Sequence, residues 1–249
     1  MAAEERSRRL AVLIDADNAS AKIVDGLFEE IATLGEASVR RIYGDFSSPR
    51  SKAWADVLTK FAILPQQQFA YTTGKNASDI ALVIDAMDLL HSGRFDGFCL
   101  VSSDSDFTRL AARIREEGAD VFGFGEQKTP ESFRQACRRF IYTENLGIHA
   151  PEAVQPVRAR HPIGEAKKML ERVISEMGAD GDWQSLGGVG SQLLNLAPDF
   201  DARNYGFGKL SELVSKIDSL EVTSEGGQKR VRKKPKAAKA LPKTSRPKA

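Results

Sequence analysis

The chain has 249 residues, of which 41% are hydrophobic and 28% charged, and its formal net charge is +2. This length allows one large or two modest domains with a proper hydrophobic core. Two cysteines exclude a disulfide framework and no apolar run approaches 18 residues, so we expect a cytoplasmic protein without membrane insertion.

The positive charge is concentrated at one end of the chain. Residues 229–249 contain ten Lys or Arg and no acid, which leaves residues 1–228 with a net charge of −8. A basic tail favours polyanions such as nucleic acid, although a merely solubilising tail is the alternative. Because Lys, Pro and Ala replace the apolar residues from 225 onward, we expect 225–249 to be disordered.

The first predicted element is a buried strand that runs into carboxylates. Four consecutive apolar residues at 11–14 continue into Asp15 and Asp17, in the stretch LAVLIDADN. A strand that is apolar throughout is typical of the middle of a parallel sheet. Carboxylates at its end are costly unless water, a cation or a hydrogen-bond partner meets them. We therefore take Asp15 as the anchor of a site.

Helical and strand patterns then alternate to about residue 142. A second buried strand is predicted at 97–102, and it also runs into carboxylates, Asp104 and Asp106, in the stretch SSDSDF. Such alternation predicts an α/β fold with a mostly parallel sheet and helices on both faces. The other predicted elements are helices at 20–34, 51–61, 80–90, 107–117 and 130–138 and strands at 37–43, 66–71, 120–124 and 140–142. The helix at 80–90 is amphipathic, with an apolar face formed by Ile80, Val83, Ile84, Met87 and Leu90.

The C-terminal part predicts a second, smaller domain. Three prolines and few apolar residues mark 147–162 as a linker. The patterns at 163–224 predict three helices followed by short strands, which suggests a winged-helix-like module. No glycine-rich phosphate-binding motif of the Rossmann or Walker type occurs anywhere in the chain.

Acidic residues from distant segments are expected to converge. The first and fourth strands are natural neighbours in a doubly wound sheet, so Asp15 and Asp104 could face one another. Asp79 starts the helix before the fourth strand, where a plain helix-capping role is the alternative. Converging carboxylates repel unless a cation lies among them, and oxygen-only ligands favour Mg²⁺ or Mn²⁺. Such a site suits hydrolysis of phosphodiesters.

Polar residues beside these carboxylates are candidate substrate contacts. Asn18 could hold a metal-bound water or a phosphate oxygen, and Lys75 could meet phosphate or be an ordinary solvated lysine. Ser102, Ser103 and Ser105 could donate hydrogen bonds to the carboxylates or cap a helix.

The motifs LIDADN, GKNASD and SSDSDF together resemble the NYN domain, a PIN-like nuclease fold, over about residues 8–146. The resemblance implies a metal-dependent ribonuclease that binds Mg²⁺ or Mn²⁺. It assigns metal binding and catalysis to four carboxylates and leaves the role of Asp17 less defined. The assigned residues are Asp15, Asp79, Asp104 and Asp106, with Asn18 carried over from the first motif.

Residues 163–224 resemble the OST-HTH or LOTUS domain, through the W-x-x-L start at Trp183, the PDF turn at 198–200 and the segment YGFGKL. This resemblance implies RNA or a protein as partner of the domain, while its aromatic residues can also be read as simple core residues. A homodimer would fit the PIN-like superfamily.

Two other functions remain open from the sequence. One is a non-catalytic RNA-binding or scaffold protein with a residual acidic site. The other is a phosphatase of the haloacid dehalogenase type, because Asp15 and Asp17 form a D-x-D after the first strand. That chemistry favours Thr or Val two residues after Asp17, where this chain has Ala19.

Overall fold

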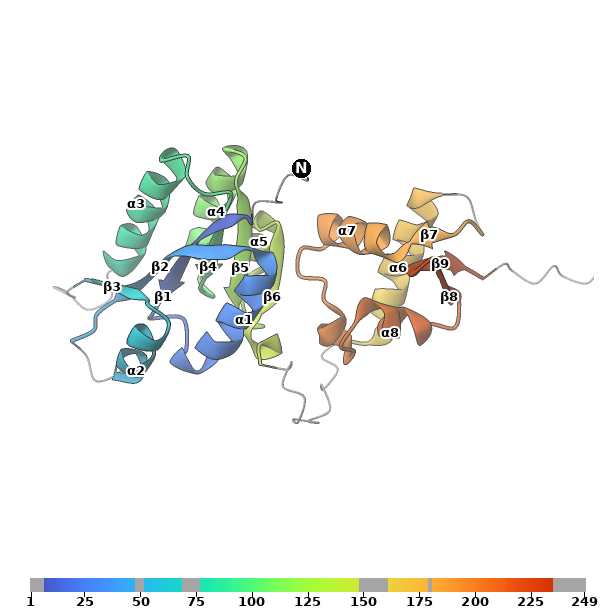
Figure 1. The fold of residues 1–249 in the computed structure, drawn as a ribbon, viewed down its shortest axis with the longest axis horizontal. Helices are drawn as coiled ribbons and strands as arrows, with labels where there is room; N and C mark the ends of the chain where they lie inside the picture. The colour runs from blue at the N-terminus through green and yellow to red at the C-terminus, as the bar shows by residue number, and fades with distance from the viewer. Residues whose placement is uncertain (1–6, 48–51, 69–76, 148–160, 179–180, 235–249) are drawn as a thin grey trace, which may run out of the picture.

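The computed structural model describes residues 7–47, 52–68, 77–147, 161–178 and 181–234. They form a larger N-terminal domain and a smaller C-terminal domain (Figure 1). Lys75, residues 148–160 of the predicted linker and the tail beyond 234 lie outside the described residues. No helix in the described ranges has both the length and the apolar character needed to cross a membrane.

The N-terminal domain is built on a six-stranded parallel sheet with the strand order β3-β2-β1-β4-β5-β6. This confirms the predicted α/β class and the predicted adjacency of the first and fourth strands. The strands are β1 (Arg9–Asp15), β2 (Glu36–Gly44), β3 (Leu64–Gln67), β4 (Gly97–Val101), β5 (Asp120–Gly125) and β6 (Arg139–Tyr142). The helical elements are η1 (Ala21–Ile23), α1 (Val24–Leu34), α2 (Lys52–Lys60), α3 (Ala77–His91), η3 (Ser105–Phe107), α4 (Thr108–Glu116), α5 (Glu131–Ala136) and η4 (Thr143–Asn145).

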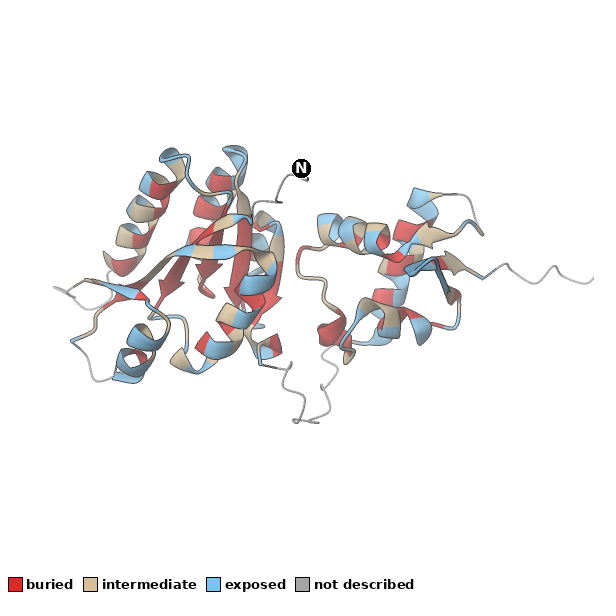
Figure 2. Cartoon of the chain, in the orientation of Figure 1, coloured by how far each residue is buried: buried red, intermediate tan, exposed pale blue. Residues whose placement is uncertain are grey.

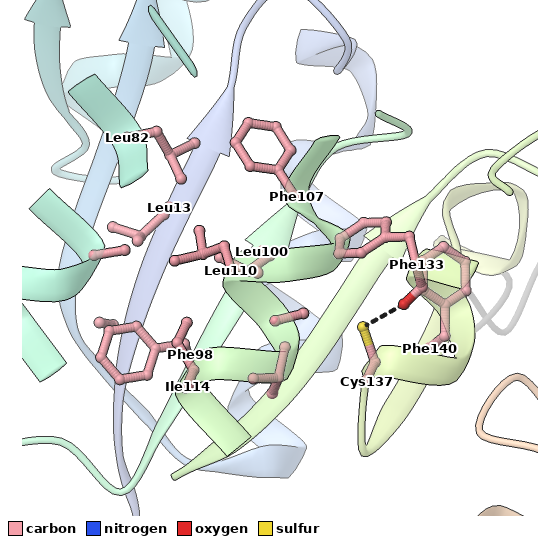
Figure 3. Close-up of a cluster of buried hydrophobic side chains, with 14 of the residues drawn as sticks. Leu13, Leu82, Phe98, Leu100, Phe107, Leu110, Ile114, Phe133, Cys137 and Phe140 are labelled. Carbon is pink, nitrogen blue, oxygen red and sulfur yellow. Dashed lines mark hydrogen bonds between the residues drawn. The ribbon is translucent and has the colours of Figure 1, made fainter. Parts of the chain in front are cut away.

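Strand β1 is buried on both faces, as its unbroken apolar run predicts. Because side chains alternate along a strand, Leu10 and Val12 join a core with α1 and α2. Ala11 and Leu13 join the opposite core with α3, α4 and α5, part of which is drawn in Figure 3. The buried residues of Figure 2 accordingly run along the central strands and the inner faces of the helices.

Helix α3 differs from its prediction in the face that it buries. The amphipathic pattern places Ile80 and Ile84 inward, but these side chains are 60% and 58% exposed. The helix instead buries Ser78, Leu82, Ala86 and Leu89 against the sheet. Apolar residues lie on more than one side of this helix, so the spacing alone does not identify the buried face. Strand β3 also begins two residues before its prediction.

The C-terminal domain packs its helices over a three-stranded sheet with the order β7-β9-β8. The expectation that disorder begins at 225 is wrong for the part that the structure describes, because β8 ends at Glu225 and pairs with β9. Gly226 and Gly227 both have positive φ and form the turn between these strands, a conformation that glycine favours. The elements are α6 (Ile163–Met177), β7 (Gln184–Ser185), α7 (Leu186–Leu196), η5 (Ala202–Tyr205), α8 (Leu210–Ser215), β8 (Leu220–Glu225) and β9 (Gln228–Lys233).

We predict that Gly123→Ala destabilises the N-terminal domain by about 1–3 kcal/mol, the usual cost of overpacking a core. A Cβ atom at Gly123 would lie 2.6 Å from both Cys137 Sγ and the Phe140 ring, a crowded part of the core in Figure 3. The control is Gly164→Ala in helix α6, where a Cβ atom would meet nothing within 4 Å. Thermal unfolding of the two variants should show a lowered midpoint for the first alone, and equal midpoints would contradict this account.

Candidate active site

The carboxyl ends of β1 and β4 place the two D-x-D stretches at one edge of the sheet. Ile14 of β1 pairs in register with Val101 of β4, so Asp15 and Ser102 follow at the same level. The strand order reverses between these two strands, and the crevice beyond such a reversal is where open α/β sheets bind ligands.

Asp15 is the buried base of the site, with an exposed fraction of 1%. Its Oδ2 accepts hydrogen bonds from Ser102 Oγ at 2.7 Å and from Asn18 Nδ2 at 2.9 Å. Its Oδ1 accepts from the backbone N–H of Asp17 at 3.0 Å. Burial raises the pKa of Asp15, and the bonds from Ser102 and Asn18 act in the opposite direction. The carboxylate is thus held in one orientation, and the prediction that Ser102 donates to it is confirmed.

Asp17 links the first strand to the start of helix α3. Its exposed side chain accepts a hydrogen bond from Ser78 Oγ at 3.0 Å, between Oδ2 and a hydroxyl 61 residues away. The sequence prediction missed Ser78, although its place beside Asp79 in the GKNASD motif is the signal that could have found it. The bond fixes the first turn of α3, and therefore Asp79, next to the end of β1.

Residues of the SSDSDF stretch both bond Asp15 and begin a short helix. Ser102 Oγ accepts from the backbone N–H of Asp104 at 3.0 Å, and Asp104 Oδ1 accepts from the N–H of Asp106 at 2.9 Å. Asp104 therefore also begins the short helix η3. The prediction that Ser103 contacts substrate gains no support, because this hydroxyl is buried and accepts from the N–H of Glu126 at 2.8 Å. Ser103 fixes the loop after β5 instead.

The electrostatics of Asp79 show that the predicted carboxylates share one region. Burial raises the pKa of this half-buried side chain, and four negative charges raise it further, to about 6. The four charges, in decreasing order of effect, belong to Asp15, Asp104, Asp17 and Asp106. Four of the sequence-predicted acids therefore lie within electrostatic range of Asp79, which is half-buried. Asp15 is buried, Asp104 is half-buried, and Asp17 and Asp106 are exposed.

The donor set fits a hard divalent cation. Every candidate ligand is an oxygen donor, and the mutual repulsion that raises the pKa of Asp79 is the kind that a cation relieves. Within the described ranges, however, no group of three or more His, Cys, Asp or Glu side chains is already arranged to hold a metal ion.

A second titratable cluster lies farther along α3, and the sequence prediction missed it. Asp85 accepts hydrogen bonds from Arg41 and from the Tyr43 hydroxyl, both on β2. Burial and the Asp85 charge raise the pKa of Tyr43. Because Asp85 of α3 bonds two residues of β2, we assign this cluster to the attachment of α3 to the sheet.

Comparison with protein families identifies both domains. The NYN domain model matches residues 9–146, and the OST-HTH/LOTUS domain model matches residues 163–231. The second match extends past the predicted boundary at 224 and includes most of strand β9. No curated protein matches the sequence.

Two solved structures show limited similarity to the chain. A protein of unknown function from Vibrio parahaemolyticus is 19% identical, with a TM-score of 0.46, over 56% of this chain and 94% of its own. An uncharacterized protein from Nitrosomonas europaea is 27% identical, with a TM-score of 0.29, over 37% of this chain and 93% of its own.

We predict that Asp79 titrates near pH 6 in the metal-free protein and that its pKa falls when Mg²⁺ is added or when Asp15→Asn removes the charge with the largest effect on it. Carboxyl NMR during a pH titration measures this directly. Asp88→Asn, an exposed site on the same helix, is the control and should leave the pKa unchanged. An Asp79 pKa near its ordinary value of 3.8 would contradict the shared-charge description.

The raised pKa of Asp79 also determines how the free energy of unfolding changes with pH. The folded state holds the Asp79 proton more tightly than the unfolded state does. Protonation of Asp79 therefore stabilises the folded state, and this stabilisation is fully present below pH 3.8. It is lost as the pH rises through about 6. Asp79→Asn should remove this part of the pH dependence of unfolding.

Proposed function

This chain belongs to the NYN domain family, part of the PIN-like nuclease superfamily, and we propose that it is a metal-dependent ribonuclease that hydrolyses RNA phosphodiester bonds. The observation that carries the proposal is the convergence of the charges of Asp15, Asp17, Asp104 and Asp106 on Asp79. These acids come from three separated motifs that the fold brings to one edge of the sheet.

Asp15, Asp79, Asp104 and Asp106 would hold the Mg²⁺ or Mn²⁺ ion. When bound, such an ion polarises the phosphoryl group and activates water. Asp15 is kept in place by Ser102 and Asn18, so its orientation does not depend on the substrate. Asn18 is exposed beside it and remains a candidate contact for phosphate, as does Lys75.

The C-terminal domain would supply the RNA affinity that the acidic body lacks. It matches OST-HTH/LOTUS domains, which bind RNA. Strand β9 presents Lys229, Arg230, Arg232 and Lys233 beside one another in the sequence. The Arg232 guanidinium lies 4.4 Å from the centre of the Trp183 ring, so an aromatic face and basic groups are adjacent. This combination is typical of surfaces that bind single-stranded nucleic acid.

A second candidate function is binding of RNA without cleavage. It is favoured by the internal hydrogen bonds that already satisfy Asp15 and by the lack of a preformed metal-ligating group among the described residues. The phosphatase alternative gains nothing from the structure, because Ser78 ties Asp17 to helix α3.

The proposal also includes the location of the protein and its protein partners. The fully buried thiols of Cys99 and Cys137 agree with a reducing, cytoplasmic location. A homodimer and a protein partner of the OST-HTH domain stay predictions.

We expect the wild-type protein to cut labelled single-stranded or structured RNA with Mn²⁺ or Mg²⁺ and not in excess EDTA. The double variant Asp15→Asn, Asp104→Asn should lower the rate at least about 100-fold, because it removes charges that would hold the metal. Asp88→Asn is the matched control and should cut normally. RNA binding without cutting by every protein would favour the second candidate function.

We expect Lys229→Ala combined with Arg230→Ala to weaken RNA binding and to reduce the slope of log affinity against log salt by about 1–2, because each phosphate contact releases counterions. Fluorescence anisotropy over a salt series measures both quantities. Lys22→Ala, a basic residue of η1 in the N-terminal domain, is the control. An unchanged salt slope would remove strand β9 from the RNA-binding surface.

A further inference from the structure

Among the described residues, one short stretch of the C-terminal domain, residues 198–204, forms hydrogen bonds and ion pairs with the N-terminal domain, and we call it the docking segment. It contains the PDF turn and most of η5, and it lies against the β6 side of the sheet (Figure 1). The backbone N–H of Phe140 in β6 donates to the Pro198 carbonyl at 2.8 Å. Asp199 accepts from the Tyr142 hydroxyl at 2.8 Å and forms an ion pair with Arg134 of α5.

The docking segment also carries a cation into the interior of the interface. Arg203 is only 5% exposed, and its Nη1 donates to Glu30 Oε2 of helix α1 at 2.8 Å. Glu30 is likewise 5% exposed, and Asp201 holds the other side of the guanidinium. Removing one partner of a buried ion pair is strongly unfavourable because it leaves an uncompensated charge. This contact therefore requires the two domains to be closely docked.

A hydrogen bond between two amide side chains, one from each domain, further restricts the orientation of the domains. Asn145, at the end of η4, is fully buried, and its Nδ2 donates to Asn204 Oδ1 at 2.8 Å. Arg203 Nη1 also reaches the Asn145 carbonyl at 3.4 Å. Hydrogen bonds have narrow distance and angle requirements, so contacts of this kind at several points define one orientation of the two domains.

The catalytic carboxylates and the basic strand lie on opposite sides of this interface. The carboxylates follow β1 and β4, in the middle of the sheet, whereas β9 lies on the side of the C-terminal domain away from the N-terminal domain (Figure 1). An RNA bound by both would have to pass the interface. The separation between its two contacts then depends on how the domains are docked.

We propose that Asp199, Arg203 and Asn204 are positioning residues, which hold the OST-HTH domain in one orientation and so fix the spacing between the RNA segment that it binds and the bond that is cut. The inference about the spacing depends on the proposed ribonuclease function, whereas the inference about the fixed orientation of the domains does not. The alternative is a C-terminal domain that is only tethered by the linker, in which case the spacing would vary.

The orientation is tested by spin labels on the full-length chain, at Asp88→Cys on α3 and Lys168→Cys on α6, both exposed sites. The native cysteines are fully buried and should not react. We expect one narrow distance distribution, which becomes at least about twofold broader in Asp199→Ala combined with Arg203→Ala, as for domains on a flexible linker. A broad distribution in the parent protein, or a narrow one in the variant, overturns the proposal.

Two further variants separate docking from folding. Tyr142→Phe removes only the hydroxyl that bonds Asp199 and should broaden the distribution less, while Arg203→Lys keeps the charge and should be intermediate. Arg172→Ala, which breaks an exposed ion pair with Glu176 on α6, is the control and should change nothing. Equal broadening by Arg172→Ala would overturn the assignment to the docking segment.

The spacing is tested by the lengths of the products from an end-labelled homopolymeric RNA of about 30 nucleotides. We expect the parent protein to give a narrow set of lengths, and the Asp199→Ala, Arg203→Ala variant to give a broad set at a similar total rate. An unchanged set in the variant overturns the spacing. If the parent protein cuts no RNA, both the proposed function and the inference about the spacing are wrong. The spin-label distances then still test whether the two domains have one fixed orientation.

Discussion

The burial of Asp15 at the end of a strand that is itself buried is the constraint on which the site depends. Burying an ionised carboxylate is unfavourable unless hydrogen-bond donors surround it. Here the donors come from the segment that follows β1 and from the end of the neighbouring strand β4. Ser102 then continues the chain of bonds to Asp104. Asp17 extends it to α3 through Ser78, so one buried anion organises three segments that are far apart in the sequence.

The parts of the structure that could be predicted from sequence are those set by local patterns. Strands β1 and β4 are unbroken apolar runs followed by carboxylates, and the order expected of a doubly wound sheet makes them neighbours. The buried face of α3 could not be predicted, because its spacing allows more than one choice. Strand β9 was hidden by its charges, since Val231 is its one fully buried residue. The contact of Arg203 with Glu30 joins residues 173 positions apart and has no local signature.

The proposed function would use the acidic cluster of the N-terminal domain and the basic residues of β9 for different tasks. The N-terminal domain gathers acids that a cation can neutralise, and such a surface repels RNA in the absence of that cation. The basic residues of β9 belong to the other domain, away from this acidic region. In the proposed function, attraction of RNA and its cleavage would take place on separate surfaces, and the orientation of the domains would decide whether one RNA can reach both.

The hydrogen bond from Phe140 to Pro198 has a further consequence for the solution behaviour of the N-terminal domain. Strand β6 is an edge of the sheet, and an uncovered edge offers its backbone groups to the edge of another molecule. The opposite edge, β3, contains Pro65, which has no backbone N–H to donate and so discourages such pairing. The PDF turn therefore shields the more vulnerable edge, and a fragment truncated before the C-terminal domain would be prone to self-association and aggregation.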